Sequence, residues 1–335
     1  MKTAVLLGGT SSERNVSMAS GTAIAKALNQ LGHNVLLLDP AFGKDQKIEP
    51  FTQVGMIPPE QYDLKQLPAE QGKALFEIVE VILSEKVDIV FNALHGGIGE
   101  NGIMQSIFEA AKIQYTGSGV MASALAMNKV TSKYIFQSCN VPTPPFLFFK
   151  NTTEWASARK AIVSTFQFPI VIKPNEEGST VGLSIVKNEN ELVAAWSKAI
   201  NYGHILVEEY IAGRELTVAV LGDQALPVIE VIPEGGFYDY EHKYTKGKTN
   251  YVCPADISPQ LSENAKRYAV KAFQGLGCKA YARVDFRLSE NNELYCLEVN
   301  TLPGMTETSL VPKAAKAEGI EFEQLVERII SLSLS

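Results

Sequence analysis

The first third of the chain alternates short apolar runs with stretches of helical periodicity, and this alternation restricts the fold more than any other feature. An apolar run, a helical pattern and a second apolar run follow one another over residues 4–38, and the pattern recurs over residues 75–111. Strands separated by helices pair in parallel, because the connecting helix returns the chain to the starting edge of the sheet. We therefore expect an α/β domain with an open parallel sheet over residues 1–118.

Two polar, glycine-containing loops follow expected strands of this domain. One spans residues 8–13 and ends in Glu13, and the other spans residues 95–99 and begins with His95. In open parallel sheets, ligands bind beyond the carboxyl ends of the strands. The two loops therefore predict one wall of a ligand site. A lone histidine is more often structural than catalytic, so His95 is either a packing residue or a residue that positions a substrate.

The sequence changes character after the glycine-rich residues 117–119. A helical stretch through Lys129 ends near a proline cluster at residues 142–145, and prolines of this kind terminate helices. Short strands, helices and hairpin signals follow in mixed order, which is typical of α+β structure. We expect two α+β subdomains, a central one over residues 119–211 and a C-terminal one over residues 212–335.

One segment of the C-terminal subdomain, at about residues 233–252, is rich in Gly, Tyr and Lys and shows no clear periodicity. Connections of this length without secondary structure are uncommon in compact domains, and those that occur are usually lids over a site or disordered. The residues alone therefore leave two interpretations of this segment, a lid loop or a disordered segment.

The composition describes an ordinary globular protein whose ligands are small. The 335 residues include 46% hydrophobic and 20% charged residues and carry a net charge of −7, which argues against nucleic acid or an anionic membrane as a partner. No apolar run has the length of a signal-peptide core or of a membrane span. The four cysteines form no Cys-x-x-Cys pair, which argues against a zinc site or a disulfide framework. We expect a cytoplasmic protein.

A predicted hairpin near the C-terminus gathers charged side chains on one face. If its turn consists of Asn291 and Asn292 only, Asp285 pairs directly with Glu298, and the flanking Arg283 and Asn300 share the same face of the sheet. Two facing carboxylates and an amide are suited to Mg²⁺ brought in with nucleotide phosphates. The alternative is a solvated sheet face whose carboxylates are balanced by arginines.

A second motif places Lys173 at the end of a strand, followed by a loop of small residues at 174–182 whose amides could bind phosphate groups. The loop is not a Walker motif, because no Gly-Lys-Ser/Thr triplet occurs in it. Residues 8–10 also lack the Gly-x-Gly-x-x-Gly spacing of a dinucleotide site. Hydride transfer and P-loop hydrolysis are therefore both disfavoured.

Taken together, these motifs resemble those of ATP-grasp enzymes and, within them, the D-alanine:D-alanine ligase family. The general ATP-grasp motifs are Lys129, Lys173, the loop 177–179, the strand 207–211 and the hairpin residues Asp285, Glu298 and Asn300. The narrower resemblance lies in the stretches 7–14, 115–124, 237–244 and 300–306. It spans nearly the whole chain and implies an ATP-grasp fold, an N-terminal parallel-sheet domain with two α+β subdomains that enclose a nucleotide.

The resemblance implies a set of residues that bind ATP and its metal ions. Phosphate ligands would be Lys129, Lys173 and the loop of Glu177, Gly178 and Ser179. The adenine pocket would be lined by Glu208, Glu209, Tyr210 and Ile211, and the ribose held by Glu215. Two Mg²⁺ ions, for which Mn²⁺ could substitute, would be bound by Asp285, Glu298 and Asn300. Without the surrounding motifs, Glu208 and Glu215 would be interpreted as ordinary surface charges.

The resemblance also implies the residues that bind the amino acid substrates. Glu13 and Ser17 would orient the ammonium group of the first D-alanine, with His95 nearby, and Arg283 would stabilise negative charge in the reaction. Ser179, Lys243 and Tyr244 would form a network that closes the lid. The carboxylate of the second D-alanine would meet Gly304, Ser309 and the amide of Leu310 at the start of a helix.

The implied reaction has two steps and yields D-alanyl-D-alanine for peptidoglycan synthesis, with ADP and phosphate as co-products. The first D-alanine attacks the γ-phosphate of ATP to give an acyl phosphate, and the amine of the second D-alanine displaces phosphate. Family analogy implies a homodimer. Alternatives are another ATP-grasp carboxylate–amine or depsipeptide ligase and a non-catalytic nucleotide-binding protein. Asn101, Asn128 and Glu176 depart from the commonest family pattern, and Glu176 adds negative charge near the expected phosphates.

Overall fold

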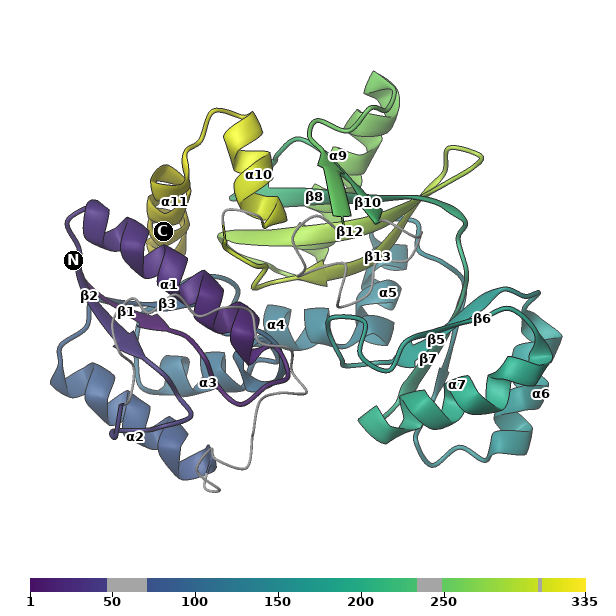
Figure 1. Cartoon of the computed structure of the whole chain (residues 1–335), viewed down its shortest axis with the longest axis horizontal. Helices are drawn as coiled ribbons and strands as arrows, with labels where there is room; N and C mark the ends of the chain where they lie inside the picture. The colour runs from purple at the N-terminus through teal and green to yellow at the C-terminus, as the bar shows by residue number, and fades with distance from the viewer. Residues whose placement is uncertain (47–70, 234–248, 307–308) are drawn as a thin grey trace.

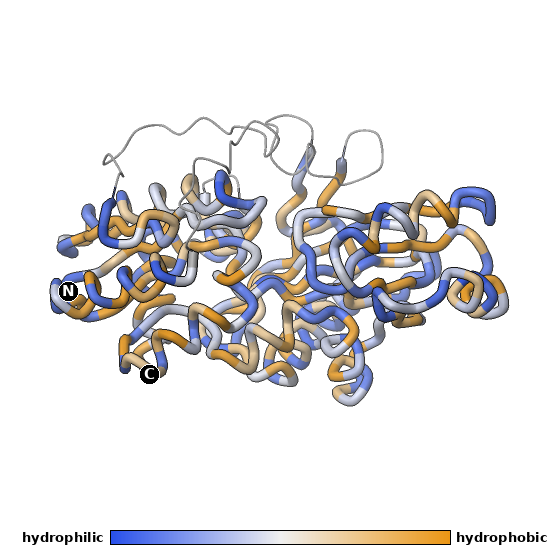
Figure 2. The backbone as a smooth tube through the Cα atoms, turned by 90° about the horizontal axis from the view of Figure 1, so that it is seen from below, coloured by the Kyte–Doolittle hydropathy of each residue, from blue (hydrophilic) through white to orange (hydrophobic). Residues whose placement is uncertain are grey.

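The computed structural model describes residues 1–46, 71–233, 249–306 and 309–335. Within these ranges the chain forms three sheets, one in each third of the sequence, and the three units lie side by side in an elongated molecule (Figure 1). Apolar stretches are short and interrupted by polar residues throughout (Figure 2). No helix in the described ranges has both the length and the apolar character needed to cross a membrane.

The N-terminal unit is the predicted α/β domain with a parallel sheet. Its strand order is β2-β1-β3, with all pairings parallel. Val5 of β1 packs in a cluster with α1 and α11, whereas Leu6 packs in a second cluster with α2 and α3. Both faces of the sheet are therefore buried, which explains the unbroken apolar runs in its strands. The elements are β1 (Lys2–Leu6), α1 (Arg14–Gln30), β2 (Asn34–Leu38), α2 (Gln71–Ser84), β3 (Ile89–Asn92) and α3 (Ile103–Ala110).

Two short helices link this unit to the central one, where the sequence had suggested a single helical stretch through Lys129. The stretch is helical as expected, but it is divided at Asn128, whose extended backbone conformation ends the first helix. The Asn128 side chain accepts a hydrogen bond from the amide of Thr131 at 3.0 Å and so caps the second helix. The helices are α4 (Val120–Met127) and α5 (Lys129–Ser138).

The central unit is an antiparallel sheet of order β4-β7-β5-β6, covered on one face by two helices. Its core includes Ile172 of β5, Val207 of β7 and Trp196 of α7. The opposite face of the sheet is turned toward the rest of the molecule (Figure 1). The elements are β4 (Phe146–Phe149), α6 (Trp155–Thr165), β5 (Ile170–Pro174), β6 (Ser184–Val186), α7 (Leu192–Ala199) and β7 (Ile205–Glu209).

The C-terminal unit has a six-stranded antiparallel sheet of order β11-β10-β8-β12-β13, with β9 paired to β8. One face packs on α9, where Val284 and Phe286 are fully buried. The last helix, α11, crosses back to α1, so Ile329 shares a core with Ile24. The elements are β8 (Gly213–Leu221), β9 (Gln224–Ala225), β10 (Ile229–Pro233), β11 (Thr249–Val252), α9 (Pro259–Gly275), β12 (Tyr281–Ser289), β13 (Leu294–Asn300), α10 (Leu310–Ala317) and α11 (Phe322–Leu334).

A buried ion pair shapes the loop after β1. Arg14 and Asp39 form a salt bridge at 2.5 Å with side chains 8% and 0% exposed. Asp39 accepts the amide of Gly9 at 2.9 Å, and Arg14 donates to the Gly9 carbonyl at 2.6 Å. The preceding Gly8 has φ +83, and a Cβ atom there would lie 2.5 Å from the Asp39 carboxylate. Only glycine fits this turn, which leads the chain into α1 and sets the position of Glu13.

Gly8→Ala is expected to lower the free energy of unfolding by about 3 kcal/mol or more, since left-handed strain adds to the clash with the buried ion pair. Gly32→Ala is the matched control, because Gly32 has φ +82 but nothing within 4 Å of the added Cβ. The control should cost only about 1–2 kcal/mol. Urea unfolding measures both, and equal losses would contradict the role given to the ion pair.

Candidate active site

One cavity of about 640 Å³ lies between the three units and collects nearly all the predicted site residues. Every predicted residue in the described ranges lines it except Ser17. The Ser17 hydroxyl instead donates to the Ala93 carbonyl at 2.7 Å and accepts from the Gly8 amide at 2.8 Å. Ser17 is fully buried and holds the loop after β1, and the substrate contact expected for it stays a prediction. Lys243 and Tyr244 lie outside the described residues.

The β12–β13 hairpin places its charged residues as predicted, but for a different reason. The turn contains three residues, 290–292, rather than two: the Ser289 amide bonds to the Glu293 carbonyl at 2.8 Å, and Asn292 has φ +62. This moves the register by one residue. A bulge at Leu297 moves it back, so Asp285 still pairs with Glu298 and Arg283 with Asn300.

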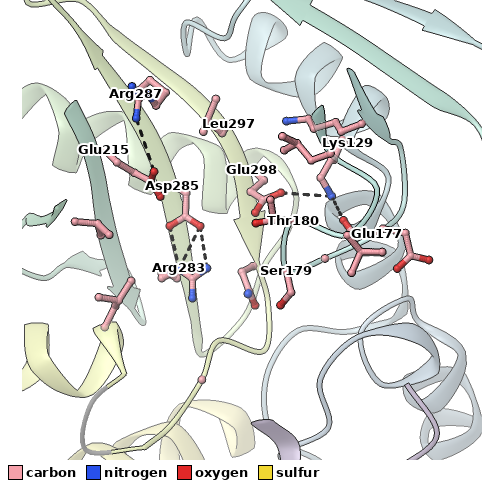
Figure 3. A pocket seen from close by; sticks show the side chains of 18 of the residues that line it. Lys129, Glu177, Ser179, Thr180, Glu215, Arg283, Asp285, Arg287, Leu297 and Glu298 are labelled. Carbon is pink, nitrogen blue, oxygen red and sulfur yellow. Dashed lines mark hydrogen bonds and ion pairs between the residues drawn. The ribbon is translucent and has the colours of Figure 1, made fainter. Parts of the chain in front are cut away.

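The cavity face of this sheet is organised in rows that cross several strands (Figure 3). Arg283 and Asn300 form the first row, and Thr217, Asp285 and Glu298 form the second. The third row contains Tyr251, Val231, Glu215 and Arg287. Arg283, Asp285 and Arg287 of β12 therefore each belong to a different row of the cavity face.

The carboxylates of the second row are neutralised by cations from two directions. Arg283 donates to both oxygens of Asp285 at 2.9 and 2.8 Å, and the Thr217 hydroxyl donates to the same carboxylate at 2.6 Å. Lys129, at the first turn of α5, lies 3.4 Å from the Glu298 carboxylate. Figure 3 shows Lys129 approaching Glu298 from the opposite wall of the cavity. The hairpin is thus one wall of an enclosed site rather than a solvated sheet face.

Lys173 is held by a buried carboxylate that the sequence had suggested for the adenine pocket. Glu208 forms salt bridges with Lys173 at 2.5 Å and with the fully buried Lys133 at 2.8 Å. Burial alone would raise the pKa of Glu208, but the two lysines together lower it to about 2. The side chain of Glu208 is therefore committed to Lys133 and Lys173. The expected adenine contact is thereby limited to the backbone of Glu208 on strand β7 and stays a prediction.

The loop after β5 is fastened both to α5 and to the N-terminal unit. The Lys129 ammonium donates to the Glu177 carbonyl at 2.6 Å, and the Val130 amide donates to the Asn175 side chain at 2.9 Å. On the other side, the Ser179 hydroxyl donates to the Glu13 carboxylate. A Cβ atom on Gly178 would lie 2.8 Å from that carboxylate, so glycine permits this close approach.

Family models and curated relatives match this chain over nearly its whole length, and all of them belong to the same family. Residues 2–118 match the family model described as D-ala D-ala ligase N-terminus, and residues 135–331 match the D-ala D-ala ligase C-terminus model. A D-alanine–D-alanine ligase of Syntrophotalea carbinolica is 42% identical over 98% of this chain and 95% of its own length. The corresponding enzyme of Carboxydothermus hydrogenoformans is 41% identical over 100% and 98%.

This chain belongs to the D-alanine–D-alanine ligase family. Solved structures agree: a Bacillus anthracis D-alanine–D-alanine ligase complexed with ATP has a TM-score of 0.78 and 28% identity, covering 100% of this chain and 97% of that chain. The Enterococcus faecalis VanG D-Ala:D-Ser ligase has a TM-score of 0.77 and 29% identity, covering 99% of each chain. The predicted family and the predicted ATP-grasp fold, with its α/β and α+β parts, are confirmed.

Two of the departures from the common pattern of the ligase family contact each other. The Asn128 side-chain amide donates to the Glu176 carboxylate at 2.7 Å. An aspartate at position 128 has no such donor at neutral pH, so asparagine accommodates the acidic Glu176. The third departure, Asn101, accepts the amide of Ile103 at 3.1 Å beside the start of α3.

Sequence reasoning missed Glu100, which also lines the cavity in this ligase-family chain. It lies 3.9 Å from His95. Burial, reinforced by the Glu13 carboxylate, raises the pKa of Glu100 well above its usual value. Burial and the Arg283 charge lower the pKa of His95 to about 4, so the imidazole is neutral at pH 7. The sequence could have predicted this residue, because Glu100 directly follows the loop 95–99 that was expected to line the site.

Hydrogen bonds around His95 join the N-terminal unit to the C-terminal unit at one side of the cavity. Its imidazole contacts the Ser20 hydroxyl at 3.1 Å, and that hydroxyl accepts the Met305 amide at 3.0 Å. Farther along, the Thr306 amide donates to the Ser309 hydroxyl at 3.0 Å, just before α10 begins at Leu310. Ser20, which His95 holds in place, therefore connects the N-terminal unit to the segment that precedes α10.

Lys133→Met is expected to lower the free energy of unfolding by about 3 kcal/mol, because it leaves the buried Glu208 with one cation in place of two. The control is Lys160→Met on the exposed surface of α6, which should change the free energy by no more than about 0.5 kcal/mol. Both values come from urea titrations. A loss below about 1 kcal/mol for Lys133→Met would show that Lys173 alone compensates Glu208.

Proposed function

We propose that this chain joins two D-alanine molecules into D-alanyl-D-alanine at the expense of ATP, for peptidoglycan precursor synthesis. The observation that carries the proposal is the single cavity in which cations and carboxylates from three units converge, with the pairs Arg283–Asp285 and Lys129–Glu298 at its centre. Relatives with about 40% identity over the whole chain bear the name D-alanine–D-alanine ligase.

The nucleotide is proposed to bind between the central and C-terminal sheets. Residues 208–211 at the end of β7 offer backbone groups to the adenine, and Glu215 on β8 accepts ribose hydroxyls. The phosphates then lie between Lys173, Lys129 and the loop 177–179. Each lysine already has a carboxylate partner, so an incoming phosphate meets cations that are held in place. Such preorganised charges stabilise transferring phosphoryl groups better than mobile ones.

Mg²⁺ fits this site as a partner of the nucleotide rather than as an ion bound by protein alone. The available donors are the oxygens of Asp285, Glu298 and Asn300, which suit Mg²⁺. Among the described residues, no group of three or more His, Cys, Asp or Glu side chains could hold a metal ion. Phosphate oxygens would therefore complete the coordination, and the bound ions would neutralise charge on the phosphates. The number of ions, predicted as two with Mn²⁺ as a substitute, stays a prediction.

The substrate end of the cavity is proposed to lie around Glu13, Arg283 and the start of α10. The Glu13 carboxylate can pair with the ammonium group of the first D-alanine, while the Arg283 guanidinium stabilises the negative charge that develops at the reacting carbonyl. Ser309 and the first amides of α10 offer donors to the carboxylate of the second D-alanine, with Gly304 beside them. His95 is neutral at pH 7, so it adds no positive charge here. The anionic groups of the substrates are bound by the donors just named.

Chemically, attack of the first carboxylate on the γ-phosphorus forms a carbon–oxygen–phosphorus linkage and releases ADP. The amine of the second D-alanine, after losing a proton, attacks the acyl carbon and releases inorganic phosphate. Acyl phosphates hydrolyse in water, so the site must exclude it. Val231 on β10 and Thr249 on β11 line the cavity and flank the segment proposed as the lid, which lies largely outside the described residues. A lid network of Ser179, Lys243 and Tyr244 is part of this proposal.

The reaction is proposed to occur in the cytoplasm, where ATP is available. A homodimer stays a prediction from family analogy. The E. faecalis relative is named for D-Ala:D-Ser ligation, so the acceptor amino acid needs a direct test.

The decisive experiment incubates the protein with ATP, Mg²⁺ and an equimolar mixture of D-alanine, D-serine and D-lactate, and identifies products by mass spectrometry. D-alanyl-D-alanine should dominate and should form in step with ADP. Omission of D-alanine is the control and should abolish ADP release. A dominant mixed dipeptide or depsipeptide would change the proposed acceptor, and absence of any ATP-dependent product would overturn the proposed function.

Arg283→Ala is expected to lower kcat by roughly 100-fold or more, since the variant lacks the charge that stabilises the developing anion. Arg159→Ala on α6 removes an arginine that is 54% exposed and should leave kcat unchanged. Initial rates of ADP release at saturating substrates make the comparison. Near-normal turnover of Arg283→Ala would contradict the catalytic role and leave Arg283 only its ion pair with Asp285.

A further inference from the structure

Arg287 makes contacts that the roles assigned so far leave unexplained. It stands two residues beyond Asp285 on β12 and lines the same cavity. Its Nε donates to the Ile211 carbonyl at 3.1 Å, and its Nη2 donates to the Gly213 carbonyl at 2.8 Å. The guanidinium also lies over the Tyr210 ring, 6.0 Å from the centroid. One side chain thus holds the short connection between β7 and β8.

The same guanidinium faces Glu215. The two residues are direct cross-strand partners on β8 and β12, and Nη1 lies 3.7 Å from the Glu215 carboxylate (Figure 3). This distance exceeds that of a hydrogen bond, so the contact is an electrostatic one that orients the carboxylate. Arg287 therefore links the two parts of the nucleotide site, the strand end proposed for adenine and the carboxylate proposed for ribose.

We propose that Arg287 is a positioning residue that makes the enzyme selective for ribonucleotides: it fixes Glu215 against the 210–213 connection so that the carboxylate accepts the ribose hydroxyls. This inference rests on the proposed function, because it assigns a task within the nucleotide subsite. It concerns the sugar, not the base or the phosphates.

The exposure of the pair explains why a positioning residue is needed. The side chain of Glu215 is 23% exposed and that of Arg287 18% exposed. A carboxylate at the cavity surface discriminates best between hydroxyl patterns when protein contacts order it before the ligand arrives, because binding then carries no ordering cost. Fixed to rigid backbone carbonyls through Arg287, Glu215 is ordered before the nucleotide arrives. Hydrogen bonds to a charged group contribute about 1.5–3 kcal/mol, which corresponds to roughly 10-fold to 100-fold in discrimination.

The location of Arg287 argues against a part in the chemical step. Arg287 lies four positions beyond Arg283 along an extended strand, a spacing of about 13 Å. The second row, with Asp285 and Glu298, lies between them. Arg287 should therefore influence recognition of the nucleotide sugar and not charge development at the reacting carbonyl.

The test compares kcat/KM for ATP and 2′-deoxy-ATP in the wild-type enzyme, Arg287→Met, Glu215→Gln and the double variant. Wild type should prefer ATP by roughly tenfold or more. Arg287→Met should reduce that preference at least threefold, mainly by raising KM for ATP. The double variant should match Glu215→Gln, because both substitutions remove the same interaction. Arg159→Met serves as the matched arginine control and should keep the wild-type preference.

The outcomes separate this inference from the proposed function. A wild-type protein that forms no ATP-dependent dipeptide overturns the proposed function itself. If the dipeptide forms but Arg287→Met keeps the wild-type preference for ATP, only the inference fails. A double variant in which the two losses multiply would also overturn it, since Arg287 would then act separately from Glu215. Urea unfolding of each variant shows whether the fold is intact, and Arg287→Lys supplies a folded variant that retains the charge without the fork of donors.

Discussion

The arrangement of the site depends on the charge balance between two facing carboxylates. Asp285 and Glu298 lie directly opposite each other on β12 and β13, and like charges in that position repel. Arg283 neutralises Asp285 from the same strand, and Lys129 neutralises Glu298 from α5. The C-terminal sheet and the start of α5 are therefore joined by electrostatics across the cavity. In the proposed function, a bound nucleotide with its metal ions would take over the same balance.

This principle extends through the proposed nucleotide site, where each cation proposed for the phosphates has a protein carboxylate as partner. Lys173 is held by Glu208, and Glu208 is in turn held by the buried Lys133. Burial of these groups costs solvation free energy, which their mutual attraction offsets. These ion pairs fix the lysine side chains before a ligand binds. Binding then exchanges one anionic partner for another and does not require each cation to be ordered anew.

Particular elements show how far sequence patterns predicted the structure. The parallel sheet, its helices and the main strands of the central unit were predicted because apolar periodicity reflects burial directly. The break at Asn128 was missed, since a single capping side chain leaves the apolar pattern on both sides intact. The hairpin register was predicted from a two-residue turn, and it held only because the bulge at Leu297 compensates the longer turn. Apolar periodicity reveals neither the third residue of the turn nor the extra residue at the bulge.

The sequence by itself determined the family, the fold class and the chemical types of residue in the site, because the motifs with their spacing are local and specific. Only the tertiary structure decided which charges meet. It gave the Glu208 side chain to two lysines, turned Ser17 into a support for Gly8, and brought Glu100 beside His95. These outcomes depend on contacts between residues far apart in the chain. A linear pattern carries no distances between such residues, so packing alone determines their partners.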